Sequence, residues 1–364
     1  MDQIEEKILK AFPLVEWSRR RVCLAASGGP DSVALVRAFV AIVKEAKLQN
    51  AVCVATVNHK LRDEESDEDA EFVRKLGTDL GIPVIVKTID RVVLDRETKR
   101  LGSLESAARK IRYELLHDAT KEFGARFLVT AHHADDQLET MLFRLFRGSG
   151  FDGLQGMATT RTFDQSLTLA RPMLAITKKE ILEYLVRLKQ NYRVDSSNAS
   201  PEFTRNRIRN ELVPLLDEIF PNRWRGALSR LAEQGKETNV FLDERVDELE
   251  REVEKETSRL KKYRQALQEL NVVEPEKHES SDVVDLPLQT LQNTPSIILK
   301  RYFMRLWRRL QWPLGEMGSE EWDRLVAGVK QRKTPRQFPG NVAALFPDSD
   351  TARFQRITSS DEKR

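Results

Sequence analysis

The sequence predicts an α/β fold with a doubly wound, mostly parallel sheet of Rossmann-like type, followed by a helical linker and a small α+β domain. In residues 1–215, short apolar runs typical of strands alternate with longer amphipathic runs typical of helices. That alternation favours a parallel sheet with helices on both faces. Beyond it, a long charged segment precedes one further helical pattern and a closing hairpin pattern.

Length and composition set the outline of the molecule. A chain of 364 residues is longer than one typical domain, and we expect a first domain at 1–218, a helical linker at 219–285 and a small domain at 286–364. The 40% of apolar residues suffices for sizeable cores, and the net charge is only +3. Because the sequence shows no apolar run of membrane-spanning length and no signal peptide, we expect a cytoplasmic protein without a membrane partner.

The elements of the first domain follow in order. Apolar runs predict strands at 22–26, 51–57, 84–89 and 127–131. Amphipathic runs predict helices at 31–46, 65–80 and 104–123. Cys23 and Cys53 are the only cysteines, and both fall in predicted strands, which indicates buried structural thiols. Without a C-x-x-C pair, cysteine-based zinc, iron–sulfur or redox sites are not expected.

A glycine-rich turn joins the first predicted strand to the first long helix. Its residues are Ser27, Gly28, Gly29, Pro30, Asp31 and Ser32. Glycine allows close backbone approach and positive φ, while the N–H groups and dipole of a helix start favour an anion. The serine hydroxyls add donors, and Asp31 is suited to hold a metal ion on phosphates. The turn predicts a phosphate site without the Walker A lysine; the alternative is an N-capped turn.

A second polar cluster opens the helix that follows the fourth strand and continues to Phe146. Within it, His132, Asp136 and Glu139 are spaced i, i+4 and i+7, so they share one face if the segment is helical. One alternative is simple capping of the helix by acids, which we favour for Asp135. Another is a zinc site of histidine and carboxylates, which is weak because the H-E-x-x-H spacing is absent.

Three polar segments follow predicted strands, namely 27–32, Asn58-His59 and 132–139. Loops after the carboxyl ends of parallel strands gather at one edge of the sheet. The sequence therefore predicts one site built from these segments. His59 is expected to be structural, and His117 and His278 are expected to have no role in the site.

The second half of the chain is less specific. Residues 237–270 are charged and aliphatic without glycine or proline, which predicts one or two long helices; a coiled-coil homodimer is an alternative, although the heptad is short and imperfect. Residues 271–285 are polar and predict a loop. Residues 295–310 predict a helix with basic residues on one face, and 338–346 predict a closing β-hairpin.

Taken together, the motifs resemble those of the bacterial tRNA(Ile)-lysidine synthases, which belong to the PP-loop (N-type ATP pyrophosphatase) superfamily. The resemblance covers residues 20–220. Besides the glycine-rich turn, it is carried by VNHKLR at 57–62, ESAARKIRY at 105–113, 130–140 with RGSG at 147–150, RPML at 171–174, DSSN at 195–198 and FTRNRIR at 203–209.

The resemblance implies an ATP- and Mg²⁺-dependent ligase. Members of the family adenylate the C2 carbonyl oxygen of the wobble cytidine in a tRNA(Ile) with a CAU anticodon, and the ε-amine of free L-lysine then displaces AMP to form lysidine. Two alternatives stay open, a PP-loop tRNA thiolase and a small-molecule amide synthetase. The thiolase normally needs a catalytic cysteine or a cluster-binding cysteine set, and the amide synthetase would lack the RNA-binding half.

The resemblance also assigns roles by motif position. Ser27, Gly28, Gly29, Pro30, Asp31 and Ser32 would bind ATP, with Asp31 near Mg²⁺. Arg112 and His132 would lie beside the nucleotide and the reacting centre. Asp136 and Glu139 would recognise the incoming lysine, and Arg205 would lie by the phosphates or the activated cytidine.

Basic residues elsewhere are candidates for contacts with tRNA. They are Arg207 and Arg209 after the last motif, and Arg301, Arg305 and Arg308 on the predicted helix 295–310. The alternative for both sets is a solvated basic face. The sequence departs from the family at Lys60, where the family usually has glycine. Longer members also carry a second C-terminal module that we do not find here, so discrimination of tRNA is expected to rest on fewer contacts.

Overall fold

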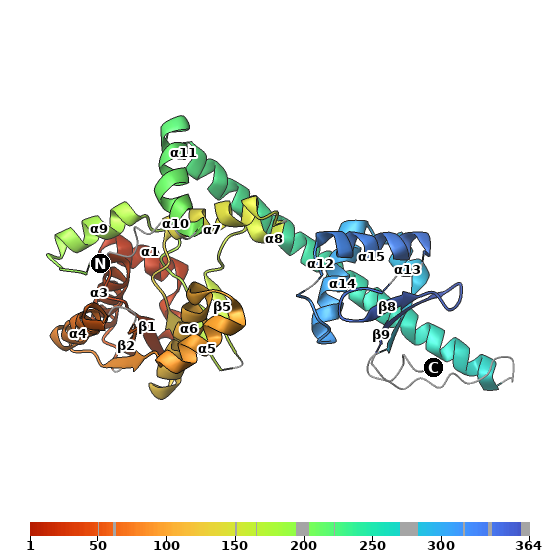
Figure 1. Cartoon of the computed structure of the whole chain (residues 1–364), viewed down its shortest axis with the longest axis horizontal. Helices are drawn as coiled ribbons and strands as arrows, with labels where there is room; N and C mark the ends of the chain where they lie inside the picture. The colour runs from red at the N-terminus through yellow and green to blue at the C-terminus, as the bar shows by residue number, and fades with distance from the viewer. Residues whose placement is uncertain are drawn as a thin grey trace. The chain divides into compact units, whose positions relative to one another are not determined.

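The computed structural model describes residues 1–49, 51–60, 63–149, 151–164, 166–193, 204–221, 223–269, 283–315, 317–333 and 337–357. The chain divides into two compact units, unit 1 at Met1–Lys236 and unit 2 at Glu237–Arg364 (Figure 1). The division falls within the helix α12 (Trp224–Glu269). The three-part division expected from the sequence, at 1–218, 219–285 and 286–364, stays a prediction.

Unit 1 is built on a six-stranded sheet in the order β3-β2-β1-β4-β6-β5. Its strands are β1 (Arg21–Ala25), β2 (Val52–Asn58), β3 (Val84–Thr88), β4 (Ala125–Val129), β5 (Thr160–Thr162) and β6 (Thr168–Ala170). All neighbours pair in parallel except β5, which is antiparallel to β6. This order places β1 and β4 side by side in the middle of the sheet, so the loops that follow them meet at one edge.

Helices cover both faces of this sheet. In chain order they are α1 (Gln3–Ala11), α2 (Leu14–Trp17), α3 (Pro30–Glu45), α4 (Asp63–Leu80), α5 (Arg91–Leu101), α6 (Leu104–Glu122), α7 (Ala134–Phe146), α8 (Phe151–Leu154), α9 (Lys178–Arg187), α10 (Thr204–Arg207), the π-helix η2 (Ile208–Leu212) and α11 (Val213–Ile219). One core joins α1, α3, α4 and α9 to the sheet, and a second joins α6 to it. The predicted doubly wound fold is confirmed.

The predicted strands and helices of unit 1 agree with the structure to within about two residues at most ends. The elements of unit 1 that were not predicted are β5, β6, α1, α2, α5, α8, α9, α10, η2 and α11. Cys23 and Cys53 are both buried, and they are paired neighbours in the register of β1 and β2, so the prediction of buried thiols is confirmed.

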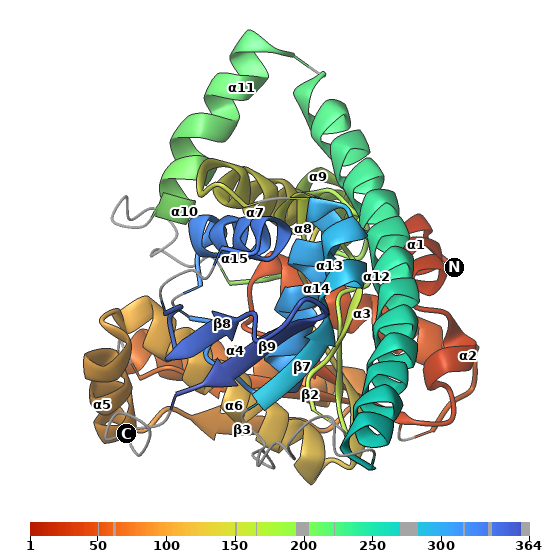
Figure 2. The ribbon, with the colours of Figure 1, turned by 90° about the vertical axis from the view of Figure 1, so that its right-hand side faces the viewer.

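Unit 2 is an α+β unit with its own core. Its elements after α12 are β7 (Val283–Pro287), α13 (Leu288–Asn293), α14 (Ser296–Arg309), α15 (Ser319–Gln331), β8 (Val342–Leu345) and β9 (Thr351–Arg356). The three strands form an antiparallel sheet in the order β7-β9-β8 (Figure 2). Trp307 lies at the centre of the core and has ring contacts with Trp312, Trp322 and Phe354.

Some expectations for this half need correction. The predicted loop at 271–285 is wrong at its end, because Val283–Pro287 forms β7; residues 271–282, with His278, lie outside the described residues. The predicted hairpin at 338–346 has a different partner, because β8 pairs with β9, and Phe338 contributes a single bridge to Val342. The long helix is continuous in α12, and α14 matches the predicted helix. No described helix combines the length and apolar character that crossing a membrane requires.

Candidate active site

The turn between β1 and α3 is shaped to receive an anion. Gly28 has a φ of +86°, which favours glycine, and an added Cβ would lie 3.3 Å from the ring of Phe72. Ser32 stabilises the turn, because its Oγ accepts the N–H of Ser27 at 3.1 Å and donates to the carbonyl of Gly29 at 2.9 Å. No side chain caps the start of α3. The N–H groups of its first turn, which begin at Asp31 because Pro30 has none, are therefore available to a bound anion.

The start of α7 is capped by its own polar residues. Nδ1 of His133 lies 3.2 Å from the backbone nitrogen of Asp135, and Oδ2 of Asp136 accepts the backbone N–H of His133 at 3.0 Å. Asp135 also accepts the N–H of Lys178 at 2.9 Å and an N–H of Arg225 at 2.8 Å. Asp135 therefore ties α7 to the starts of α9 and α12, whereas the carboxylate that caps α7 itself is that of Asp136 and not, as expected, that of Asp135.

The two motifs meet at Asp31. Oδ2 of Asp31 lies 3.7 Å from Nε2 of His133, which also lies 3.4 Å from Oδ2 of Asp136. Nζ of Lys178 donates to Oδ1 of Asp31 at 2.6 Å. Burial would raise the pKa of Asp31, but His133 and Lys178 hold it below its usual value. Burial would likewise lower the pKa of His133, but the carboxylates of Asp135, Asp31 and Asp136 raise it to about 9.

Three cavities converge on this point. The first, of about 290 Å³, extends along the ends of β1, β2 and β4 and includes apolar atoms of Ala25, Val57 and Leu116. The second, of about 790 Å³, is shared by the glycine-rich turn and α7. The third, of about 270 Å³, lies between α6, α7 and α10. Arg112 and Asp136 line all three, so a nucleotide and a second ligand bound in these cavities would share them.

Most of the predicted site residues line at least one of these cavities. In the first or second lie Ser27, Gly29, Pro30, Asp31, Ser32, Arg112, His132, Asp136 and Glu139. Arg205 lines the third, and Arg209 lines the second and third. Gly28 lines none of them and instead shapes the turn. His59, expected to be structural, lines the first and second cavities.

His132 is set up as a neutral side chain. Its Nδ1 lies 2.9 Å from Oγ1 of Thr130. Burial and the charges of Arg171, Arg109 and Arg112 outweigh Asp136 and lower its pKa to about 4. At neutral pH the ring therefore carries no positive charge, and its Nε2 is the nitrogen left to contact a bound base.

Arg209 forms ion pairs with Asp136 and Glu139, the two carboxylates to which the family resemblance assigns lysine recognition. Its Nε donates to Oε1 of Glu139 at 2.6 Å, and its Nη2 donates to Oδ1 of Asp136 at 3.0 Å. The π-helix η2 carries Arg209 into this position. Burial raises the pKa of Glu139 despite the opposing charge of Arg209. Arg207 instead forms an exposed pair with Glu211. A contact of either arginine with tRNA stays a prediction.

The basic residues on α14 differ in their surroundings. Arg301 and Arg305 both form ion pairs with Asp243 of α12, at 2.8 and 2.9 Å. Arg308 is exposed and forms no ion pair with another described residue. The predicted tRNA surface on α14 therefore consists of one open arginine and two that already have carboxylate partners.

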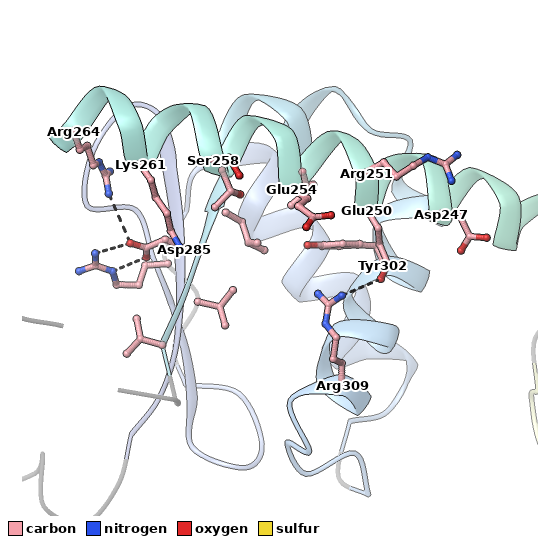
Figure 3. A pocket seen from close by; sticks show the side chains of 16 residues that line it. Asp247, Glu250, Arg251, Glu254, Ser258, Lys261, Arg264, Asp285, Tyr302 and Arg309 are labelled. Atoms are coloured by element: carbon pink, nitrogen blue, oxygen red, sulfur yellow. Dashed lines mark hydrogen bonds and ion pairs between the residues drawn. The ribbon is translucent and has the colours of Figure 1, made fainter. Parts of the chain in front are cut away.

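Unit 2 also contains a cavity of about 1000 Å³ that the sequence did not predict, between α12, β7 and α14 (Figure 3). At one end, the carboxylate of Asp285 forms ion pairs with Nη1 of Arg264 at 3.7 Å and with Nε of Arg353 at 2.7 Å. At the other end, Oε1 of Glu250 lies 3.6 Å from Nη1 of Arg309. Within the described part of the chain, the buried hydroxyl of Tyr302 has no hydrogen-bond partner.

Sequence reasoning missed Lys178, although a signal existed. Thr177 and Glu180 form a capping box at the start of α9, which the T-x-x-E pattern indicates. The pattern predicts the helix start but not that Lys178 faces Asp31. Lys60 adopts a φ of +47° and pairs with Asp67, so this residue takes the left-handed backbone that favours the family's glycine. The motif residues 195–198 lie outside the described residues.

Comparisons with known proteins agree with this architecture. The model of the PP-loop domain family matches residues 1–216. A protein of Chlorobaculum tepidum named tRNA(Ile)-lysidine synthase is 36% identical over 228 residues, which are 63% of this chain and 66% of that protein. One of the same name from Geobacter sulfurreducens is 43% identical over 212 residues, 58% of this chain and 42% of that protein. The chain thus spans less than two thirds of each relative's length.

One solved structure shares the fold. It is the U34-tRNA thiolase NcsA from Methanococcus maripaludis with its [4Fe-4S] cluster, at a TM-score of 0.50 and 17% identity, covering 64% of this chain and 77% of that chain. At that identity the likeness concerns the fold alone. The family match covers more than half of the chain, and it agrees with the strand–turn–helix site and the parallel sheet. The chain therefore belongs to the PP-loop family of ATP-binding proteins.

Proposed function

We propose that this protein joins free L-lysine to C2 of the wobble cytidine of a tRNA(Ile) with a CAU anticodon. ATP adenylates the cytidine, pyrophosphate leaves, and lysine then displaces AMP to form lysidine. The names and identities of the relatives support this reaction. The structural observation that carries the proposal is the 3.7 Å approach of Asp31 to His133, which brings the phosphate turn and the acid-rich start of α7 into one site.

The first half-reaction needs a bound triphosphate and a carbonyl oxygen aimed at its α-phosphorus. The first N–H groups of α3 and the hydroxyls of Ser27 and Ser32 are placed to bind the leaving pyrophosphate. The O2 atom of cytidine forms a bond to the α-phosphorus as the bond to pyrophosphate breaks. Arg112 lines every cavity of the site and is suited to stabilise the charge that develops.

Mg²⁺ would share the negative charge of the triphosphate when bound. Within the described ranges, no group of three or more histidine, cysteine or carboxylate side chains could hold a metal ion. A single carboxylate with phosphate oxygens and water is nevertheless a set of ligands that Mg²⁺ accepts. Asp31 fits that role, because it lies at the start of α3 and its lowered pKa keeps it ionised.

The second half-reaction needs an amine that arrives charged and attacks neutral. Asp136 and Glu139 provide two carboxylates beside the cavity that the cytidine would enter. The lysine ammonium would have to replace the guanidinium of Arg209 on these groups. Because burial raises the pKa of Glu139, this carboxylate is suited to accept a proton from the ammonium before the amine attacks C2.

The chemistry of the cysteines favours the ligase over a thiolase. A [4Fe-4S] cluster is usually held by cysteine thiolates, and a persulfide route needs an accessible thiol. This sequence contains two cysteines, and both are buried in the sheet. A small-molecule amide synthetase would share the ATP site, but it would not need the basic cavity beside it. These two activities are the outcomes that the test must separate.

The test combines the protein, ATP, a tRNA(Ile) transcript with a CAU anticodon, and labelled lysine. We expect label in the RNA, one AMP for each lysine incorporated, and a nucleoside with the mass of lysidine. A transcript with uridine at the wobble position is the matched RNA control. Asp31→Asn is the matched protein control and should lose AMP formation while still binding RNA. AMP formation without RNA labelling, or incorporation of labelled sulfur, would contradict the proposal.

A further inference from the structure

The cavity of about 270 Å³ between α6, α7 and α10 is unusually rich in arginine. Its lining includes Arg109 and Arg112 from α6 and Arg205 from α10, together with Arg209. The carboxylates beside them are Glu105, Asp136 and Glu139. Arg209 pairs with Asp136 and Glu139, so these two are already compensated. Glu105 is left to face the other three arginines.

Those three arginines form no ion pair with another described residue. Arg109 and Arg112 instead contact the same aromatic residue, each with its guanidinium carbon 5.5 Å from the ring centre of Tyr113. Arg205 lies 5.8 Å from the ring centre of Phe143. Burial and the charge of Arg109 lower the pKa of Arg205. The cluster thus keeps positive charges close together without enough negative charge to balance them, as expected for an anion site.

The ATP phosphates do not account for this cluster. None of residues 27–32 lines this cavity. Arg112, His132 and Asp136 line both this cavity and the one along the strand ends, so the two spaces meet at the reacting centre. An anion bound by Arg109 and Arg205 is therefore a second anion, adjacent to the base that reacts.

An RNA strand carries an anion at that place. If a cytidine within a strand enters the site, as in the proposed function, a backbone phosphodiester must lie next to it. One guanidinium group can donate two parallel hydrogen bonds to two oxygens of a phosphate. Stacking on an aromatic ring orders the guanidinium group before the phosphate binds. We propose that Arg109 and Arg205 form a subsite for the phosphodiester that flanks the nucleotide being modified. This inference rests on the proposed function, and it names the RNA group that the site binds besides the reacting base, namely the flanking phosphodiester.

The test removes single charges from the RNA and from the protein. A stem-loop RNA with CAU in its loop is prepared as a series, each with one neutral methylphosphonate linkage. Binding of each RNA is measured without ATP or lysine for the wild type, Arg109→Gln and Arg205→Gln. Lys121→Gln is the matched control, because it removes a positive charge from α6 outside the cavity. Circular dichroism and thermal unfolding confirm that each variant is folded.

We expect one linkage in the loop at which neutralisation weakens wild-type binding about tenfold, as for a charge-assisted hydrogen bond. Arg109→Gln should weaken binding of the unmodified RNA by a similar factor. The affinity of this variant should no longer change when that linkage is neutralised. Its salt dependence should also fall by roughly 0.7 in slope, the value for one phosphate of a single strand. Lys121→Gln should keep the wild-type pattern.

Two results would overturn the subsite. In one, Arg109→Gln and Arg205→Gln keep the full wild-type sensitivity at every linkage; in the other, no linkage affects the wild type. If lysine is incorporated into tRNA while either result is found, the subsite alone fails. If the linkage pattern is as expected while no lysine is incorporated, the subsite stands and the proposed reaction fails. Absence of any RNA binding would reject both.

Discussion

Glu139 is a buried carboxylate whose charge is balanced by Arg209. Glu139 is 7% exposed, and its carboxylate already accepts two N–H groups of Arg209, at 2.6 and 2.9 Å. The guanidinium of Arg209 and the ammonium of a lysine each carry one positive charge. The carboxylates of Asp136 and Glu139 are therefore already arranged to bind a cation. Arg209 compensates the charges of Asp136 and Glu139, which avoids leaving buried charges unpaired.

Loss of one of these carboxylates should affect the use of lysine more than the activation of RNA. For Glu139→Ala we expect the KM for lysine to rise about 10- to 100-fold, as for a lost hydrogen bond to a charged group. AMP formation in the absence of lysine should change much less. Single-turnover measurements of the two half-reactions check this. An equal loss in both would argue that Glu139 serves the fold or the adenylation step.

The neutral ring of His132 links the site to stability. Its pKa of about 4 in the folded state lies below the ordinary 6.5, so between these values the unfolded chain binds a proton that the folded chain does not. Stability contributed by His132 is therefore present above pH 6.5 and is lost as the pH falls toward 4. From pH 6.5 to 4, the wild type should lose on the order of 3 kcal/mol more unfolding free energy than His132→Gln. Urea titrations of the two proteins at each pH measure this difference in unfolding free energy. Identical dependence of the unfolding free energy on pH would mean that His132 is protonated as readily in the folded chain as in the unfolded chain.

At the scale of elements, the sequence predicted the strands whose side chains are almost all apolar. β1 and β2 are buried runs bounded by polar turns, so their pattern is clear. β5 and β6 have three residues each, and every residue of β5 is exposed, so no hydrophobic pattern marks it. α5 is predominantly polar, with only Leu94 and Glu97 buried, which hid its helical period.

The same reasoning separates the site residues that could be predicted from those that could not. Asp31 and Asp136 follow strands directly, so topology alone brings them to one edge. Lys178 and Arg209 come from later segments, and their place depends on tertiary packing and on the π-helix η2. A local pattern does not encode such contacts, so the ion pairs of Arg209 with Asp136 and Glu139 were not predicted.

The arginines of α14 make a prediction for this element. Arg308→Glu should weaken binding of the tRNA transcript and lower its salt dependence by about one to two phosphate equivalents, with little change in thermal stability, because Arg308 is exposed. Arg301→Glu should instead lower thermal stability, since it places a carboxylate against Asp243. Salt-dependent binding and thermal unfolding of both variants check this. An unchanged salt slope for Arg308→Glu would identify the exposed side of α14 as a solvated face.

At the scale of the whole molecule, each unit has a separate hydrophobic core. The core of unit 1 contains Trp17, and that of unit 2 contains Trp307; both side chains are fully buried. The proposed ATP site lies in unit 1, since all the described residues that line its cavities come before residue 237. A destabilising substitution in the core of unit 1 should therefore reduce nucleotide binding. An equivalent substitution in the core of unit 2 should leave nucleotide binding largely unchanged.

Matched substitutions of the two tryptophans test this independence. Truncation of a buried tryptophan to alanine costs about 3–5 kcal/mol, so each variant should unfold its own unit at a lower temperature. In Trp307→Ala, unit 2 should already be unfolded at a moderate temperature at which unit 1 is still folded. At that temperature the variant should still bind ATP with near wild-type affinity. Trp17→Ala should lose ATP binding over the same range, because its core supports β1 and α3 on either side of the phosphate turn. Calorimetry combined with nucleotide titration at each temperature measures both properties. Equal loss of ATP binding in the two variants would show that the units are stable only together, and the ATP site would then depend on the whole chain.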